Sequence, residues 1–112
     1  EFLRNRLTAM RKKFRKPYIV SEFGADSIPG LHTEHNLMWS EEFQVEVVSR
    51  LIAEAQKYPF VAGTHVWVLN DFKVAQHTNR VVNNWKGVFT RDRHPKMCAH
   101  MLRKLWQKPV KR

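Results

Sequence analysis

Residues 16–26 read KPYIVSEFGAD, an apolar run that carries one acid, Glu22, and breaks at Gly24. The segment from Tyr18 to Phe23 predicts a buried strand, because its β-branched and aromatic residues suit a sheet. A carboxylate at the tip of a buried strand is costly unless it is paired or used. Glu22 is therefore either a salt-bridged structural residue or a site residue.

Helical patterns flank this strand, and a second strand follows. Apolar side chains three or four residues apart indicate the helices, and Ser40 is expected to cap the second of them. The predicted elements are a helix over residues 2–15, the strand over 18–23, a helix from Ser40 to about Ala55, a strand over 60–69 and a helix that follows Pro95. This order predicts an α/β fold whose two strands are parallel and covered on both faces. Two strands form no stable sheet alone, so we expect a piece of a larger α/β fold.

Long connections follow the carboxyl ends of both strands. Residues 24–39 separate the first strand from its helix, and residues 70–92 follow the second strand. Connections in α/β units ordinarily take about two to six residues, and long ones are usually functional or disordered. This edge is where α/β barrels and open α/β sheets build their active sites. Strand alternation places Glu22 on the face of Val20, opposite Phe23.

Length and composition limit the class of protein. With 112 residues, 43% of them hydrophobic, the chain is about one small domain that should fold or dock. The single cysteine, Cys98, excludes an internal disulfide framework and a cysteine-based zinc site. The chain shows no signal peptide and no apolar run of about 20 residues. We expect a soluble chain with no membrane partner, in an undetermined compartment.

Positive charge raises a separate possibility. The 20 Lys and Arg residues outnumber the 10 acids and give a net charge of +10, which suits a nucleic-acid-binding protein. Much of the charge lies near the two ends of the chain, where it is typical of solvated helix faces. No zinc finger, RNP-type strand or glycine clamp accompanies it. We expect no nucleic-acid partner, although that function stays open as an alternative.

Few patterns in the chain indicate metal or nucleophile chemistry. His32 and His35 have H-x-x-H spacing, but one such pair in a loop is weak evidence for a metal site, and surface histidines are the simpler interpretation. There is no G-x-S-x-G motif and no phosphate-binding glycine loop. We therefore expect no metal and no cofactor, and nucleophilic chemistry would fall to a carboxylate.

Glu22, Trp67 and the cluster NRVVNNWKG, residues 79–87, together suit a sugar-acid site. Alternation places Trp67 on one strand face with Gly63 and His65, at the tip of the second strand. Aromatic rings stack on sugar rings, carboxylates attack or stabilise an oxocarbenium-like centre, and Lys and Asn side chains hold an anionic group. A buried tryptophan and a salt-bridged glutamate are the structural alternative.

Five motifs, in this order and spacing, resemble the C-terminal end of β-glucuronidases of glycoside hydrolase family 2: KPYIVSEFGADSIPGLH, MWSEEFQ, VAGTHVW, NDF and NWKGVFTRDRHPK. The resemblance implies a (β/α)₈ TIM barrel of which residues 1–112 are about the last quarter, with no second domain. The chain would be the last two β-α units, preceded by a helix. The implied reaction is hydrolysis of β-D-glucuronides by a retaining double displacement.

The resemblance also implies roles for five residues. Glu22 matches the family's nucleophile in T/S-E-Y-G, and Asn84 and Lys86 match the Asn-x-Lys motif that recognises the sugar carboxylate. Arg80 lies where the family often has an arginine near that carboxylate, and Trp67 matches a tryptophan of the sugar pocket. The expected substrate is a glucuronide-type sugar.

Two departures limit the match. The chain has WVLNDF where the family typically shows WNFADF, so Val68 replaces an asparagine and Asn70 an alanine. The family's acid/base glutamate follows an asparagine, and no Asn-Glu dipeptide occurs here. The chain alone is therefore expected to be inactive and to need the remainder of the barrel or to self-associate. A non-catalytic remnant or interaction module is the second hypothesis, since an unclosed barrel exposes strand edges.

Overall fold

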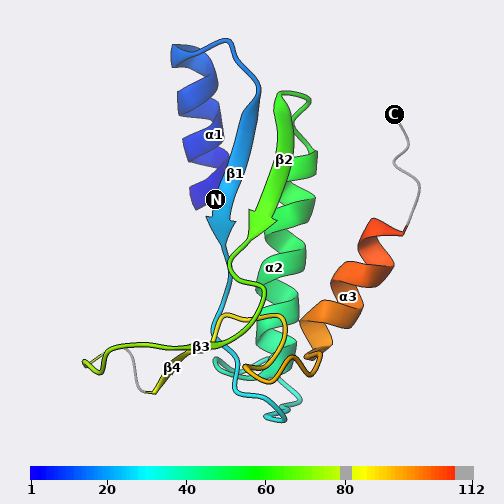
Figure 1. Cartoon of the computed structure of the whole chain (residues 1–112). Helices are drawn as coiled ribbons and strands as arrows, with labels where there is room; N and C mark the ends of the chain where they lie inside the picture. Colours follow the sequence, from blue (N-terminus) through cyan, green and yellow to red (C-terminus); the bar gives the residue numbers. More distant parts are fainter. Residues whose placement is uncertain (79–81, 108–112) are drawn as a thin grey trace.

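The computed structural model describes residues 1–78 and 82–107. Its elements are, in order, α1 (Phe2–Lys13), β1 (Tyr18–Phe23), α2 (Glu41–Gln56), β2 (Val61–Val66), β3 (Phe72–Lys73), β4 (Asn83–Asn84) and α3 (Met97–Trp106). β1 and β2 pair in parallel, with Tyr18 opposite Val61 and Phe23 opposite Val66. Figure 1 shows α2 running alongside these strands, with α1 beside β1. The predicted β-α-β unit is confirmed.

The two later helices begin in different ways. Ser40 caps α2 as predicted, since its Oγ accepts a hydrogen bond from the backbone N–H of Phe43 at 3.1 Å. α3 begins at Met97 and follows Pro95 as predicted. The cap residue Lys96 is extended, and its N–H donates to the carbonyl of Val88 at 3.0 Å. A long-range hydrogen bond that the sequence does not reveal thus holds the residue at the start of this helix.

The core forms where α2 and α3 pack together against the strands. Its buried side chains are Val48, Ile52, Val88, Cys98 and Leu102. Phe23 and Val66 pack against this cluster, whereas Ile19 of β1 is 57% exposed. The predicted alternation is wrong at Phe23, because the register between the strands shifts between Val20 and Phe23. Within the described residues, β1 is therefore not covered on both faces as predicted.

The long second connection is structured where it is described. β3 and β4 form a short antiparallel pair, with Phe72 opposite Asn84. β2 ends at Val66, three residues before the predicted end, and the chain beyond it pairs with a later segment instead. The N–H of Val68 donates to the carbonyl of Lys86 at 3.2 Å, and the N–H of Phe89 donates to the carbonyl of Leu69 at 2.9 Å. In the described part of the chain, no helix is long and apolar enough to cross a membrane.

We predict that Cys98 reacts with iodoacetamide only after the chain unfolds. The thiol is fully buried in the core, and burial raises its pKa to about 12, so the reactive thiolate is scarce. Mass spectrometry at mildly alkaline pH should find no adduct after brief exposure in buffer and one adduct per chain in urea. Equal labelling rates in buffer and in urea would contradict the packing of α3 on α2.

Candidate functional site

The carboxyl ends of β1 and β2 approach each other closely. The N–H of Trp67 donates to the carbonyl of Phe23 at 2.8 Å. A Cβ placed on Gly24 would lie 2.1 Å from the carbonyl oxygen of Trp67 and 3.9 Å from the Cβ of Lys86. Only glycine permits such an approach of one backbone to another. The sequence break at Gly24 is therefore a point where β1, β2 and the later loop meet.

The segment from Asn84 to Val88 lies between the two strand tips. The N–H of Ser27, just after β1, donates to the carbonyl of Trp85 at 3.0 Å. On the other side, the N–H of Val88 donates to the carbonyl of Val68 at 3.0 Å. Figure 1 shows these connections gathered below the arrowheads of β1 and β2. The predicted meeting of the long loops at this edge is confirmed.

Four of the predicted site residues belong to these segments. Glu22 is exposed near the end of β1, and Trp67 is 36% exposed and meets the ring of Phe72 edge-on at 6.3 Å between centroids. Asn84 is buried, and its Oδ1 accepts a hydrogen bond from the backbone N–H of Lys86 at 3.1 Å. An amide that accepts at its oxygen keeps its NH₂ group as a donor. The fifth predicted residue, Arg80, lies outside the described residues.

Lys86 forms an ion pair with Asp26, which lies two residues after Gly24. The second oxygen of that carboxylate, Oδ1, accepts a hydrogen bond from the backbone N–H of Trp85 at 3.3 Å. The lysine predicted to read a substrate carboxylate is thus already held by a carboxylate of the chain. The peptide bond between Trp67 and Val68, on the neighbouring strand tip, is cis.

A buried lysine that sequence reasoning missed joins the same segments. Lys96 is 1% exposed at its side chain, and its Nζ lies 2.9 Å from Oδ2 of Asp71, whose side chain is fully buried. The ammonium also donates to the carbonyl of Ser27 at 2.8 Å and to that of Trp85 at 3.2 Å. Asp71 in turn accepts from the N–H of Gly87 at 2.9 Å. No spacing pattern distinguishes Lys96 from the exposed lysines of the chain.

Gln44 on α2 is a second residue that sequence reasoning missed. Its Nε2 lies 3.0 Å from the carbonyl oxygen of Ala25 and 3.0 Å from that of Gly87. The carbonyl of Lys86 lies 3.3 Å from the same atom. A glutamine within the apolar face of a predicted helix was the available signal, because a buried amide requires partners.

Burial shifts both charges of the Lys96 pair toward neutrality. It raises the pKa of the Asp71 carboxyl and lowers the pKa of the Lys96 ammonium, against the attraction between the two groups. Desolvation is therefore the larger effect at each residue, and the pair persists because each charge also has hydrogen-bond partners.

His32 has a structural contact in the loop after β1. Its Nδ1 lies 2.8 Å from Oε1 of Glu42, and this hydrogen bond raises the pKa of the imidazole. The backbone N–H of Thr33 also donates to Glu42, at 3.2 Å. Across residues 1–78 and 82–107, no three His, Cys, Asp or Glu side chains are grouped as metal ligands. The pair His32 and His35 gains no support as a metal site from this arrangement.

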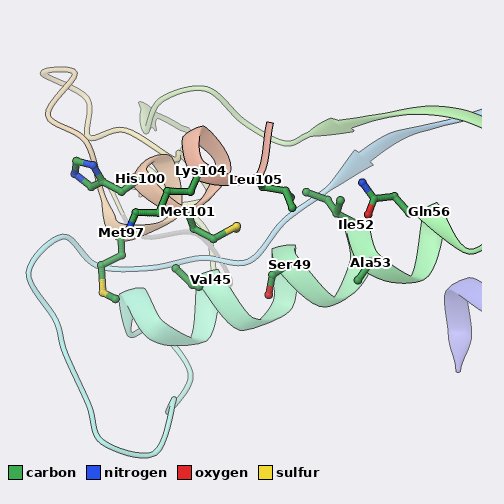
Figure 2. Close-up of a pocket in the computed structure, with 10 residues that line it drawn as sticks. All are labelled: Val45, Ser49, Ile52, Ala53, Gln56, Met97, His100, Met101, Lys104 and Leu105. Atoms are coloured by element: carbon green, nitrogen blue, oxygen red, sulfur yellow. The ribbon is translucent and has the colours of Figure 1, made fainter. Parts of the chain in front are cut away.

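A separate hollow of about 570 Å³ lies between α2 and α3, as Figure 2 shows. Its lining is mostly apolar and includes Ile52, Met97, Met101 and Leu105. None of the described site residues lines it. We assign it no part in the candidate site.

Comparison with known proteins decides the family. A model described as "Glycosyl hydrolases family 2, TIM barrel domain" matches residues 1–111. The chain belongs to glycosyl hydrolase family 2. This confirms the resemblance inferred from the motifs and the α/β class of the fold.

The similar proteins are β-glucuronidases. The chain is 44% identical to the β-glucuronidase of Paenibacillus borealis over 100 residues, which are 89% of this chain and 17% of that protein. It is 39% identical to human β-glucuronidase over 99 residues, which are 87% of this chain and 15% of that protein. This family 2 chain thus spans about a sixth of the length of these relatives.

Solved structures give the same result. The β-D-glucuronidase of Dictyoglomus thermophilum is 46% identical, with a TM-score of 0.92 over 95% of this chain and 18% of that one. A Bifidobacterium dentium β-glucuronidase complexed with coumarin-3-O-glucuronide is 42% identical, with a TM-score of 0.86 over 94% of this chain and 17% of that one. The family 2 chain therefore has the fold of a segment of these enzymes.

We predict that Lys96→Met lowers the free energy of unfolding by about 3–5 kcal/mol, because it leaves the Asp71 carboxylate buried and unpaired. Urea denaturation measures the loss, and Lys104→Met on the exposed face of α3 is the matched control. In the variant, the pKa of folded Asp71 rises further, because Lys96 no longer lowers it. It then lies even farther above the pKa of Asp71 in the unfolded chain. Folding then favours the protonated acid, so part of the loss should be recovered as the pH falls through that raised pKa. Equal losses in the two variants would contradict the pairing.

Proposed function

We propose that residues 1–112 form about the last quarter of the catalytic (β/α)₈ barrel of a retaining β-glucuronidase. In this proposal β1 and β2 are the last two barrel strands, α2 and α3 are the helices that follow them, and α1 precedes them. The parallel pairing of β1 with β2 and the order of the elements support this position. A barrel of this kind has eight β-α units, of which two are a quarter.

The observation that carries the proposal is the approach of the Asn84–Lys86 segment to the tip of β1. A Cβ on Gly24 would lie 3.9 Å from the Cβ of Lys86, and Gly24 follows Glu22 by two residues. A nucleophile for the anomeric carbon and a group that recognises the C6 substituent must lie within one sugar ring of each other. The close approach of their backbones supports such a spacing.

Glu22 is the proposed nucleophile. Its carboxylate attacks the anomeric carbon, the bond to the aglycone oxygen breaks, and a glycosyl ester forms on Glu22. A second carboxylic acid gives its proton to the leaving oxygen and then takes a proton from the water that hydrolyses the ester. Exposure of Glu22 at the carboxyl edge of β1 supports this role, since a nucleophile must be reachable by substrate.

Asn84, Lys86 and Arg80 are the proposed readers of the sugar carboxylate. An ammonium, a guanidinium and an amide NH₂ all donate hydrogen bonds, and charge-assisted bonds to a carboxylate are the strong ones. The Bifidobacterium enzyme is described with a glucuronide, and a Ruminococcus gnavus β-glucuronidase is described with uronic deoxynojirimycin. Both ligands carry the uronic acid that these side chains would select.

Trp67 is the proposed apolar platform for the sugar. Its ring is partly exposed and is oriented by an edge contact with Phe72, so one aromatic surface is presented at the tip of β2. Stacking of C–H faces on such a ring adds affinity for a pyranose without distinguishing glucuronides from glucosides. Selectivity then rests with the carboxylate readers.

The proposed reaction needs an acid/base carboxylate from the remainder of the barrel. The family's acid follows an asparagine, and the sequence of this chain has no Asn-Glu dipeptide. Within the described residues, β1 and β2 form a two-stranded sheet, so each has an edge free to pair with a further strand. We expect those edges to bind the remaining barrel strands or, in isolation, a second copy of the chain.

A grafted enzyme tests this proposal. The whole chain replaces the matching segment of the Dictyoglomus thermophilum β-glucuronidase, and hydrolysis of a chromogenic β-D-glucuronide is measured. The graft should be active, and Glu22→Gln should lower kcat by about 10³-fold or more, because no ester can form. Glu34→Gln, a change at an exposed glutamate, is the matched control and should retain activity.

Two results would contradict the proposal. An active graft in which Glu22→Gln has no effect would remove Glu22 as the nucleophile. A graft that folds, binds no glucuronide and is inactive would favour a non-catalytic interaction module. Circular dichroism and thermal melting of each variant separate these outcomes from a failure to fold.

A further inference from the structure

Asp26 contacts two groups of the loop that faces β1, the side chain of Lys86 and the backbone N–H of Trp85. The ammonium of Lys86 contacts Oδ2 of Asp26, and Oδ1 accepts the backbone N–H of Trp85 at 3.3 Å. The side chains of Lys86 and Asp26 are 22% and 16% exposed, so the ion pair is largely screened from water. One carboxylate therefore fixes both the head of Lys86 and the backbone beside it.

We propose that Asp26 is a positioning residue, which holds the Lys86 ammonium in the orientation that receives the carboxylate of a glucuronide. The proposal rests on the proposed function, because it takes Lys86 as a reader of that carboxylate. Asp26 acts through Lys86 and makes no contact with the sugar.

The chemistry of lysine explains why a positioning residue is useful. Its ammonium stands on a flexible four-carbon stem, and ordering that stem when substrate binds would reduce affinity. A lysine that is already ordered by Asp26 avoids this loss. An ammonium has three N–H donors, so a bond to Asp26 leaves donors for a second carboxylate.

The backbone that carries Asp26 is itself held firmly. The next residue, Ser27, is buried, and its N–H donates to the carbonyl of Trp85 at 3.0 Å. The carbonyl of Ser27 accepts from the ammonium of Lys96 at 2.8 Å. The carboxylate is thus presented by a fixed segment, which is what positioning of Lys86 requires.

Asp26 also places a negative charge near an anionic ligand. Its repulsion of the ligand carboxylate opposes the gain in affinity from an ordered Lys86. In the proposed arrangement the Lys86 ammonium lies between the two carboxylates, so each carboxylate is closer to the cation than to the other carboxylate. Attraction falls with distance and is strongest at direct contact. Loss of orientation should therefore outweigh relief of repulsion when Asp26 is removed.

The test compares two ligands that differ at the carboxylate. Dissociation constants of uronic deoxynojirimycin and of deoxynojirimycin, which carries a neutral hydroxymethyl group instead, are measured by calorimetry on the grafted enzyme. Their ratio is the preference for the carboxylate, and it requires no turnover. Asp26→Ala should reduce this preference about tenfold, since a charge-assisted contact to the ligand is weakened. The neutral ligand should bind about as before.

Three further single variants and one double variant make the result specific. Asp26→Asn keeps the shape and an acceptor for Trp85 but lacks the charge, and it should reduce the preference in the same direction with less risk to folding. Asp92→Asn, at an exposed aspartate, is the matched control and should change neither constant. Lys86→Met should reduce the preference by itself, and adding Asp26→Ala to it should cause no further reduction.

The outcomes separate the two proposals. If Lys86→Met reduces the preference but neither Asp26 variant does, or if an Asp26 variant increases it, the positioning role is overturned while the proposed function stands. If the Asp26 variants weaken both ligands equally, the residue is merely structural and the positioning role is again overturned. If Lys86→Met leaves the preference unchanged, the proposed carboxylate reader itself is wrong.

Discussion

The buried ammonium of Lys96 is the constraint on which the arrangement of the site depends. It contacts the segment after β1 through Ser27, the segment after β2 through Asp71, and the later loop through Trp85. Burying a lone ammonium costs several kcal/mol, so these contacts must form together or the charge remains uncompensated. The three segments are 69, 25 and 11 residues from Lys96 in sequence. One charge thus links three loops that are distant from one another in sequence.

Two glycines make the same convergence sterically possible. A Cβ on Gly24 would collide with the carbonyl oxygen of Trp67, and one on Gly87 would lie 2.1 Å from the backbone nitrogen of Asp71. The loops therefore meet backbone to backbone, where hydrogen bonds replace side-chain packing. Gln44 completes the junction from α2 by donating to carbonyls on both sides. The proposed site residues stand on or beside this hydrogen-bonded junction, which suits groups that must keep a fixed spacing.

The sequence predicts the helices and strands well because their apolar patterns are local. Ser40 caps α2 and Tyr18–Phe23 forms β1, since capping and strand propensity act within a few residues. The face of Phe23 is predicted wrongly, because a register shift of β1 against β2 decides it. The meeting of the long loops follows from parallel strands, but the roles of Lys96 and Gln44 do not. Their partners are distant in sequence, and polar side chains in helical segments are ordinarily solvated.

The candidate site combines features that have little meaning one by one. A carboxylate at the end of a core strand, an exposed aromatic ring and a lysine beside an asparagine are each weak evidence alone. Folding brings the segments that carry them to one edge of the sheet, and the function we propose gives this combination a reaction. In the function we propose, selectivity for a uronic acid depends on how well the ammonium of Lys86 is ordered before substrate binds.

The most direct test of the central claim is to trap the covalent intermediate on the grafted enzyme. In a 2-deoxy-2-fluoro glucuronyl fluoride, the anomeric fluoride leaves readily when the nucleophile attacks, and the fluorine at C2 slows hydrolysis of the resulting glycosyl ester. The nucleophile therefore accumulates as a covalent adduct. Mass spectrometry of the peptides that pepsin releases at acidic pH should locate the sugar on Glu22. An adduct on any other carboxylate, or turnover of the reagent with no adduct at Glu22, would contradict the assignment of the strand-tip acid as the nucleophile.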